Sequence, residues 1–184
     1  MEKIVFEGEN YYYQNGVLYD SSYIEVPKEY ANRVLAEYFR RVDYKELCEK
    51  DLISLIIELK KAEVFQECLN IINYGAEKFY DSFNYFKVVF PIATSCYRRI
   101  GQSQKAIDFW MNNKSIFQQF ASSVPLLTSL AAAYCDVGDY KRAKYCADRG
   151  YFTQGGGQGH KNELALVYYR IRKEAPELFD DFDD

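Results

Sequence analysis

The amino-acid sequence predicts a mainly α-helical protein with a small antiparallel β-hairpin or sheet at its N-terminal end. The first 26 residues are rich in aromatic and β-branched side chains around an Asn-Gly pair, a composition typical of a hairpin. From Pro27 onward, apolar side chains recur three and four positions apart, which is the period of amphipathic helices. A pattern of tyrosine, glycine and alanine also recurs, and it indicates helices organised in repeated pairs.

The hairpin signal is the dipeptide Asn15-Gly16, which stands between YYY and VLY. A type I′ turn needs positive φ at both central residues, and asparagine and glycine accept that conformation best. We therefore expect strands near residues 3–6, 10–14 and 17–20, with a further extended piece at 23–26.

Three consecutive tyrosines, Tyr11 to Tyr13, alternate between the two faces of the predicted sheet. One face can pack on the helix that begins at Pro27, leaving the other as ordinary amphipathic surface. Alternatively, exposed rings can stack on bases or seat a protein partner.

The helical part begins with PKEYANRVLAEYFRR, in which a proline suits the first turn and Tyr30, Val34 and Tyr38 share a stripe. Similar stripes and short connections follow to the end of the chain. They predict helices at about 44–61, 64–79, 83–99, 103–119, 124–137, 140–151 and 161–174.

The recurring pattern is Y-x-x-x-G-x-x-x-x-A, which occurs twice with a displacement of 37 residues. A weaker third copy lies upstream, and LALVY at 164–168 matches LAAAY at 130–134 as a half-copy. The three copies are Leu59, Glu63 and Cys68; Tyr97, Gly101 and Ala106; and Tyr134, Gly138 and Ala143.

These residues resemble the tetratricopeptide repeat (TPR) family. The resemblance implies TPR-like units of two antiparallel helices, in which small residues permit close packing, an aromatic fills the space beside them and a glycine makes the turn. Stacked units would form a curved superhelical array, because no single unit buries its apolar stripe. We therefore expect a hairpin region at 1–26, a TPR-like helical repeat domain at 27–175 and an acidic C-terminal tail at 176–184.

Charge and composition exclude several classes of function. A net charge of -4 argues against broad attraction to phosphate backbones, and neither a membrane-spanning run nor a secretory signal is recognisable, so we expect a cytoplasmic protein without a membrane partner. Five cysteines, none of them in a C-x-x-C pair, and a single histidine predict reduced core thiols and no metal. The segment 153–161 lacks the Gly-Lys-Ser/Thr of a phosphate loop, so we expect no nucleotide cofactor.

The candidate site is a file of residues that follow the aromatic position of each unit. The resemblance implies that these helix ends face the concave side, where the family receives a peptide or a partner helix. Arginine there can clamp a carboxylate, or the cations can simply complement the helix dipole and stay solvated. The candidate partner-binding residues are Lys60, Lys61, Arg98, Arg99, Tyr169 and Arg170.

No nucleophile–base pair or paired carboxylates can be identified from spacing, so we expect no catalysis. The favoured function is a protein–protein interaction module, an adaptor or accessory subunit whose groove docks a protein or peptide partner, including an acidic one. The alternatives are a nucleic-acid-contacting accessory subunit and a peptide-sensing regulator. The acidic segment around Phe179 and Phe182 is either a solvated tail, a docking motif, or a competitor that folds back onto the basic file.

Overall fold

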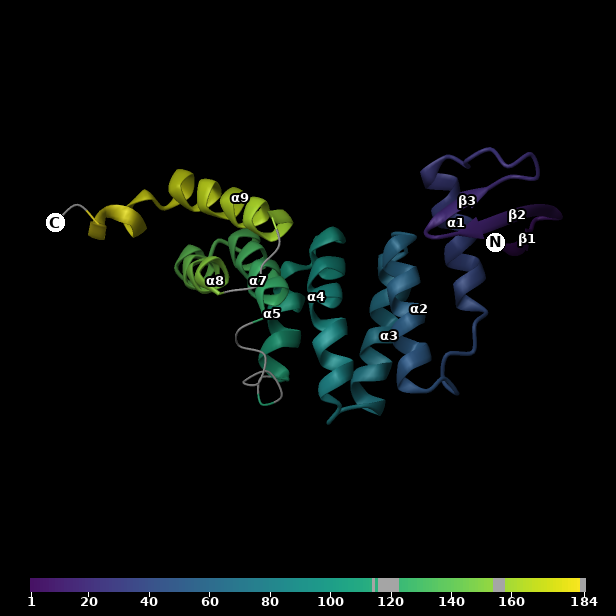
Figure 1. The fold of residues 1–184 in the computed structure, drawn as a ribbon, viewed down its shortest axis with the longest axis horizontal. Helices are drawn as coiled ribbons and strands as arrows, with labels where there is room; N and C mark the ends of the chain where they lie inside the picture. The colour runs from purple at the N-terminus through teal and green to yellow at the C-terminus, as the bar shows by residue number, and fades with distance from the viewer. Residues whose placement is uncertain (114, 116–122, 154–157, 183–184) are drawn as a thin grey trace. The chain divides into compact units, whose positions relative to one another are not determined.

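The chain is mainly helical, with a three-stranded antiparallel sheet at its N-terminal end (Figure 1). The computed structural model describes residues 1–113, 115, 123–153 and 158–182. These residues form two compact units, Met1–Tyr85 and Phe86–Asp184, which we describe separately.

Unit 1 begins with strands β1 (Glu2–Phe6), β2 (Glu9–Gln14) and β3 (Val17–Tyr19), paired in that order. Positive φ values of 51° at Asn15 and 88° at Gly16 confirm the predicted turn. The extended piece expected at 23–26 is reduced to one bridge between Tyr19 and Glu25.

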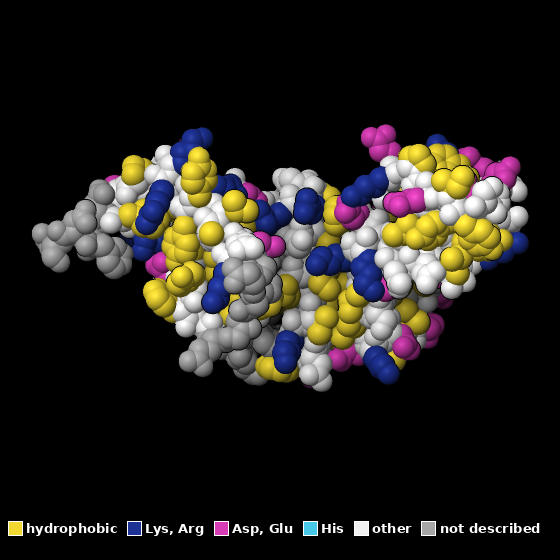
Figure 2. Space-filling view, turned by 45° about the horizontal axis from the view of Figure 1, so that its top comes forward, with side chains coloured by type: hydrophobic (Ala, Val, Ile, Leu, Met, Phe, Trp, Pro, Cys, Tyr) yellow, Lys and Arg dark blue, Asp and Glu magenta, His cyan; other side chains and the backbone are white. Residues whose placement is uncertain are grey.

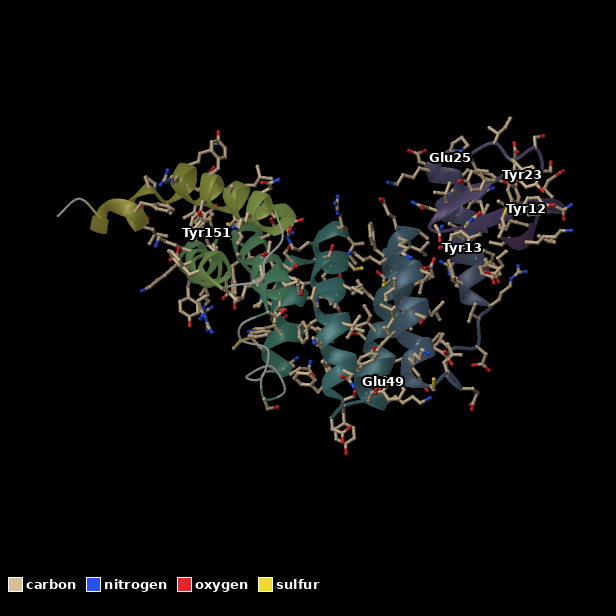
Figure 3. All side chains as sticks on the ribbon, in the orientation of Figure 1. Tyr12, Tyr13, Tyr23, Glu25, Glu49 and Tyr151 are labelled. Atoms are coloured by element: carbon tan, nitrogen blue, oxygen red, sulfur yellow. The ribbon has the colours of Figure 1, made fainter. Side chains whose placement is uncertain are left out.

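The alternating tyrosines settle which face of the sheet is packed. Tyr11 and Tyr13 are buried, and their hydroxyls lie 3.0 Å from Tyr30 Oη and from Glu58 Oε2 respectively. Tyr12 lies on the opposite face, where its ring stacks on Tyr23 at 5.1 Å (Figure 3). The sheet therefore packs its Tyr11 face on helices, as a small sheet requires for stability.

Three helices complete unit 1: α1 (Lys28–Arg40), α2 (Glu49–Lys61) and α3 (Phe65–Lys78). The predicted helix at 44–61 begins five residues late, because its first carbonyls have other partners. The oxygen of Lys45 accepts hydrogen bonds from Tyr74 Oη at 3.0 Å and Lys78 Nζ at 2.6 Å, and Lys78 Nζ also reaches the oxygen of Leu47. The side chains of Tyr74 and Lys78 thus take the place of the backbone N–H groups that would bind these carbonyls in a helix.

The boundary between the units falls in α4 (Phe83–Arg99), and α5 (Ser103–Asn112) follows it. The part of the helix predicted beyond 113 falls largely on residues 114 and 116–122, which lie outside the described residues. The glycine-rich residues 154–157 and the side chain of His160 also lie outside them. Unit 2 continues with α7 (Val124–Asp136), α8 (Tyr140–Phe152), α9 (Gln158–Glu174) and the 3-10 segment η2 (Pro176–Phe182).

Small residues bring α7, α8 and α9 together. Ala131, Ala143 and Ala147 have no exposed surface. A Cβ at Gly150 would lie 3.3 Å from Leu164 Cδ1, so this glycine also marks a close approach between α8 and α9. Ala143, a small residue of the predicted pattern, therefore packs in the core, as do Ala131, Ala147 and Gly150.

One turn geometry ends three of the helices, α2, α4 and α7. In each, the residue after the turn donates its N–H to the carbonyl five positions earlier, at 2.8–3.0 Å, and the turn residue donates to the carbonyl three positions earlier. The turn residues Glu63, Gly101 and Gly138 all have positive φ, of 58°, 72° and 80°. This is the Schellman arrangement, and it occurs at the three turn positions that the sequence pattern predicts.

Gly75 in α3 offers a test of packing in unit 1. A Cβ at this position would overlap the hydroxyl and ring of buried Tyr85 and approach Leu52 Cδ2 to 2.8 Å. We predict that Gly75→Ala lowers the free energy of unfolding by about 1–3 kcal/mol, because overpacking outweighs the better helix propensity of alanine.

The control is Glu77→Ala on the exposed side of the same helix, expected to stay within about 0.5 kcal/mol of wild type in urea denaturation. Gly75→Ala combined with Tyr85→Phe should lose less stability than the two single variants together. A stabilised Gly75→Ala protein would contradict the packing described.

Candidate functional site

Unit 2 brings together three residues from helices far apart in sequence. Arg98 stands in the last turn of α4, Asp136 ends α7 and Arg170 lies near the end of α9. The Schellman turns at Gly101 and Gly138 end the first two helices just beyond these residues, so local turn geometry fixes where both side chains emerge.

Asp136 links the two arginines. Arg98 Nε donates to its Oδ2 at 2.8 Å, and Arg170 Nη1 donates to its Oδ1 at 2.9 Å. Ser103 Oγ, at the start of α5, also donates to Oδ2 at 2.9 Å. One carboxylate therefore binds two guanidinium groups, and the trio of Arg98, Asp136 and Arg170 carries one net positive charge.

The environment of Asp136 favours its charged form. Partial burial alone would raise the pKa of Asp136, but the hydrogen bonds from Arg98 and Arg170 outweigh it and hold the pKa below its usual value of 3.8. The carboxylate is therefore ionised at neutral pH and keeps both arginines in place.

A groove of about 340 Å³ is lined by the two arginines of this trio. It combines charged and apolar walls, and the α9 residues that line it fall on one helical face. Two of its apolar side chains, Leu166 and Tyr169, are about two-thirds exposed, at 65% and 69%. The lining residues are Arg98, Ala132, Glu163, Leu166, Val167, Tyr169 and Arg170.

The sequence-predicted site residues fall into two groups. Arg98, Tyr169 and Arg170 line this one groove in unit 2, while Arg99 is exposed at the end of α4. Lys60 and Lys61 belong to unit 1, at the end of α2: Lys60 is exposed, and Lys61 Nζ lies 2.7 Å from Glu58 Oε1.

Three residues in and around the groove are not among the predicted partner-binding residues. Asp136 follows Tyr134 by two positions, as Lys61 follows Leu59 and Arg99 follows Tyr97. The available signal was therefore an acidic residue at a position that is basic in the other two repeats. Ser103 and Leu166 gave no comparable signal, because their roles depend on which helices pack together.

Unit 1 contains a smaller cavity of about 170 Å³ between β3, α1 and the turn after α2. The ion pair between Lys28 Nζ and Glu63 Oε2, at 2.5 Å, joins two of its lining residues. The backbone of Gly16 also packs against Lys61, where a Cβ would come within 2.9 Å of Lys61 Cβ. We regard this cavity as a packing seam between the sheet and the helices.

The cysteines sit mostly in the core. Cys68, Cys96, Cys135 and Cys146 are buried, whereas Cys48 is exposed and donates to Asp51 Oδ2 at 3.2 Å. Burial raises the pKa of the Cys146 thiol to about 11. Within the described ranges, no group of three or more His, Cys, Asp or Glu side chains is placed to hold a metal ion.

Comparison of the chain with protein-family models, with curated proteins and with solved structures found no match. In the part of the chain that the structure describes, no helix has both the length and the apolar character needed to cross a bilayer.

The pKa of Asp136 gives a pH-dependent prediction. Asp136→Asn should lower the free energy of unfolding at pH 7 by about 1 kcal/mol, a value kept small because both arginines are partly exposed. The folded-state pKa is depressed, so this stabilisation is complete above the ordinary value of 3.8 and disappears as the pH falls through the folded-state value.

Urea denaturation of both proteins between pH 7 and pH 3 measures the effect, and the gap between them should close on acidification. Asp108→Asn in α5, an exposed site bonded to Gln104 of the same helix, is the matched control and should shift stability by less than about 0.5 kcal/mol. A gap that widens at low pH would refute the role assigned to Asp136.

Proposed function

We propose that the chain is a non-enzymatic protein–protein interaction module with a TPR-like superhelical array, acting as a cytoplasmic adaptor or accessory subunit. A partner segment docks in the groove of unit 2. The observation that carries the proposal is that Arg98, Tyr169 and Arg170, which the repeat register of the sequence singles out, line the same groove.

The chemistry of the groove suits a segment that combines an acidic and an apolar side chain. Arginine has five N–H donors, and Asp136 accepts one from Arg98 and one from Arg170, so each guanidinium keeps donors for a partner carboxylate. Leu166 and Tyr169 supply adjacent apolar surface. The volume lies at the lower end of the range for ligand sites, which suits one or two side chains.

Glu163 sets the selectivity of this groove. It lies on the same face of α9 and opposes the positive charge of the two arginines. A partner carboxylate is therefore accepted only where it reaches the guanidinium groups and avoids Glu163.

The TPR-like assignment rests on the shared turn. Glu63, Gly101 and Gly138 each follow a large residue of the first helix by four positions and precede a small residue of the second by five. The large residues Leu59, Tyr97 and Tyr134 and the small residues Cys68, Ala106 and Ala143 are all buried, as inter-helix packing in such units requires.

The test is a selection of random peptides on the wild-type chain, followed by fluorescence anisotropy with the selected peptides. Selected sequences should pair Asp or Glu with a neighbouring apolar residue. We predict that binding falls by about tenfold in Leu166→Ala/Tyr169→Ala and in Arg170→Gln, corresponding to about 1.4 kcal/mol. Glu163→Gln should bind more tightly.

Phe152→Ala, at a residue 79% exposed on α8, removes apolar surface elsewhere and serves as the control. Selected peptides that bind all these variants equally would overturn the groove as the docking site. Tight binding of single-stranded nucleic acid with a steep salt dependence would favour the nucleic-acid alternative instead.

A further inference from the structure

The segment η2 places Phe179 in a site built by α8 and α9. Its ring lies 6.3 Å from the ring of Tyr168, with the planes at 64°. The guanidinium of Arg172 lies 4.9 Å from the centre of the Phe179 ring, and Lys144 Nζ lies 5.4 Å from it. We call the surface formed by Lys144, Tyr168 and Arg172 the Phe179 seat.

Two residues of the seat, Lys144 and Tyr168, make contacts that do not involve Phe179. Asp148 of α8 accepts a hydrogen bond from Tyr168 Oη at 2.6 Å and another from Lys144 Nζ at 3.0 Å. Burial and this hydrogen bond to Asp148 raise the pKa of Tyr168, so its hydroxyl stays protonated and keeps donating at neutral pH. The contacts that place Lys144 and Tyr168 therefore do not depend on Phe179.

The charge of the seat matches the sequence that occupies it. Two cations face one aromatic ring, an arrangement favoured by the quadrupole of the ring. The occupying stretch, ELFDDFDD, surrounds Phe179 with carboxylates in the sequence. Figure 2 shows Lys and Arg side chains among hydrophobic ones over the α8–α9 end of unit 2. The seat thus presents two cations to an aromatic side chain that the sequence flanks with acids.

The segment η2 follows α9 through a short connection. Pro176 cannot continue α9, which ends at Glu174. Buried Ala175 anchors the connection, and Leu178 N donates to the Ala175 oxygen at 3.2 Å. Phe179 itself is only half-buried.

We propose that the Phe179 seat is a second peptide-recognition site, which takes an acidic, phenylalanine-containing segment of a partner protein and which the chain's own η2 occupies until that partner binds. The seat is separate from the groove at Arg98 and Arg170, so the proposal stands or falls independently of the proposed function.

The probe is a fluorescent synthetic peptide with the sequence of residues 174–184, added in trans to the full-length chain. Phe179→Ala opens the seat without shortening the protein. We expect the peptide to bind the Phe179→Ala chain about tenfold more tightly than wild type, because cis occupancy reduces the fraction of open seats. A peptide with alanine in place of its Phe179 should not bind.

Comparing Arg172 with its neighbour Lys173 distinguishes binding in the seat from general electrostatic attraction of an acidic peptide. In the Phe179→Ala background, Arg172→Ala should weaken peptide binding by about two- to fivefold, the range expected for one cation–π contact. Lys173→Ala removes the same charge from an exposed residue whose ion pair is with Glu174, and it should leave affinity unchanged.

The proposal is overturned by equal peptide affinity for wild type and a folded Phe179→Ala chain, by no binding to either, or by equal losses from Arg172→Ala and Lys173→Ala. Circular dichroism verifies folding of each variant. Self-association of wild type that Phe179→Ala abolishes would make a second copy the occupant and overturn the assignment to a foreign partner. Leu166→Ala/Tyr169→Ala should leave this peptide's affinity unchanged.

Discussion

The left-handed turn residue that ends α2, α4 and α7 is the constraint on which the described helix pairs depend. A positive φ at Glu63, Gly101 and Gly138 reverses the chain within a few residues and lets the turn N–H groups satisfy the last helical carbonyls. The following helix then returns alongside the first, and buried small residues permit the close contact. Without this turn, neither the pairing nor the position of the residues just before it is defined.

The same turn explains why the chemistry of unit 2 gathers where it does. Arg98 and Asp136 lie in the last turn of their helices, next to the reversal, and α9 adds Arg170 from across the groove. Asp136 accepts hydrogen bonds from both arginines, which offsets their mutual repulsion, and each guanidinium keeps further N–H donors. The Phe179 seat is built in a similar way, because one carboxylate, that of Asp148, accepts hydrogen bonds from both Lys144 and Tyr168.

The sequence predicts the local features well because they have local causes. Asn15-Gly16 and the turn glycines report backbone conformation directly, and helical periodicity places most elements within a few residues. The late start of α2 was not predictable, since it depends on Tyr74 and Lys78 of α3 capturing its first carbonyls. The partnership of Arg98, Asp136 and Arg170 likewise depends on which helices become neighbours. The sequence leaves the acidic segment at 176–184 open between a solvated tail, a docking motif and a competitor. The contacts of Phe179 with Tyr168 and Arg172 depend on tertiary packing, so spacing does not predict them.

The central claim is that one left-handed turn organises all three helix pairs, and the most direct test compares glycine with alanine at its key residue. Nothing lies within 4 Å of a Cβ at Gly101 or Gly138, so only backbone strain distinguishes the two residues there. Urea denaturation of Gly101→Ala, Gly138→Ala, Glu63→Gly and Glu63→Ala should show glycine more stable than alanine by about 1 kcal/mol at every position. Alanine equal to or better than glycine at any of the three would contradict the shared turn.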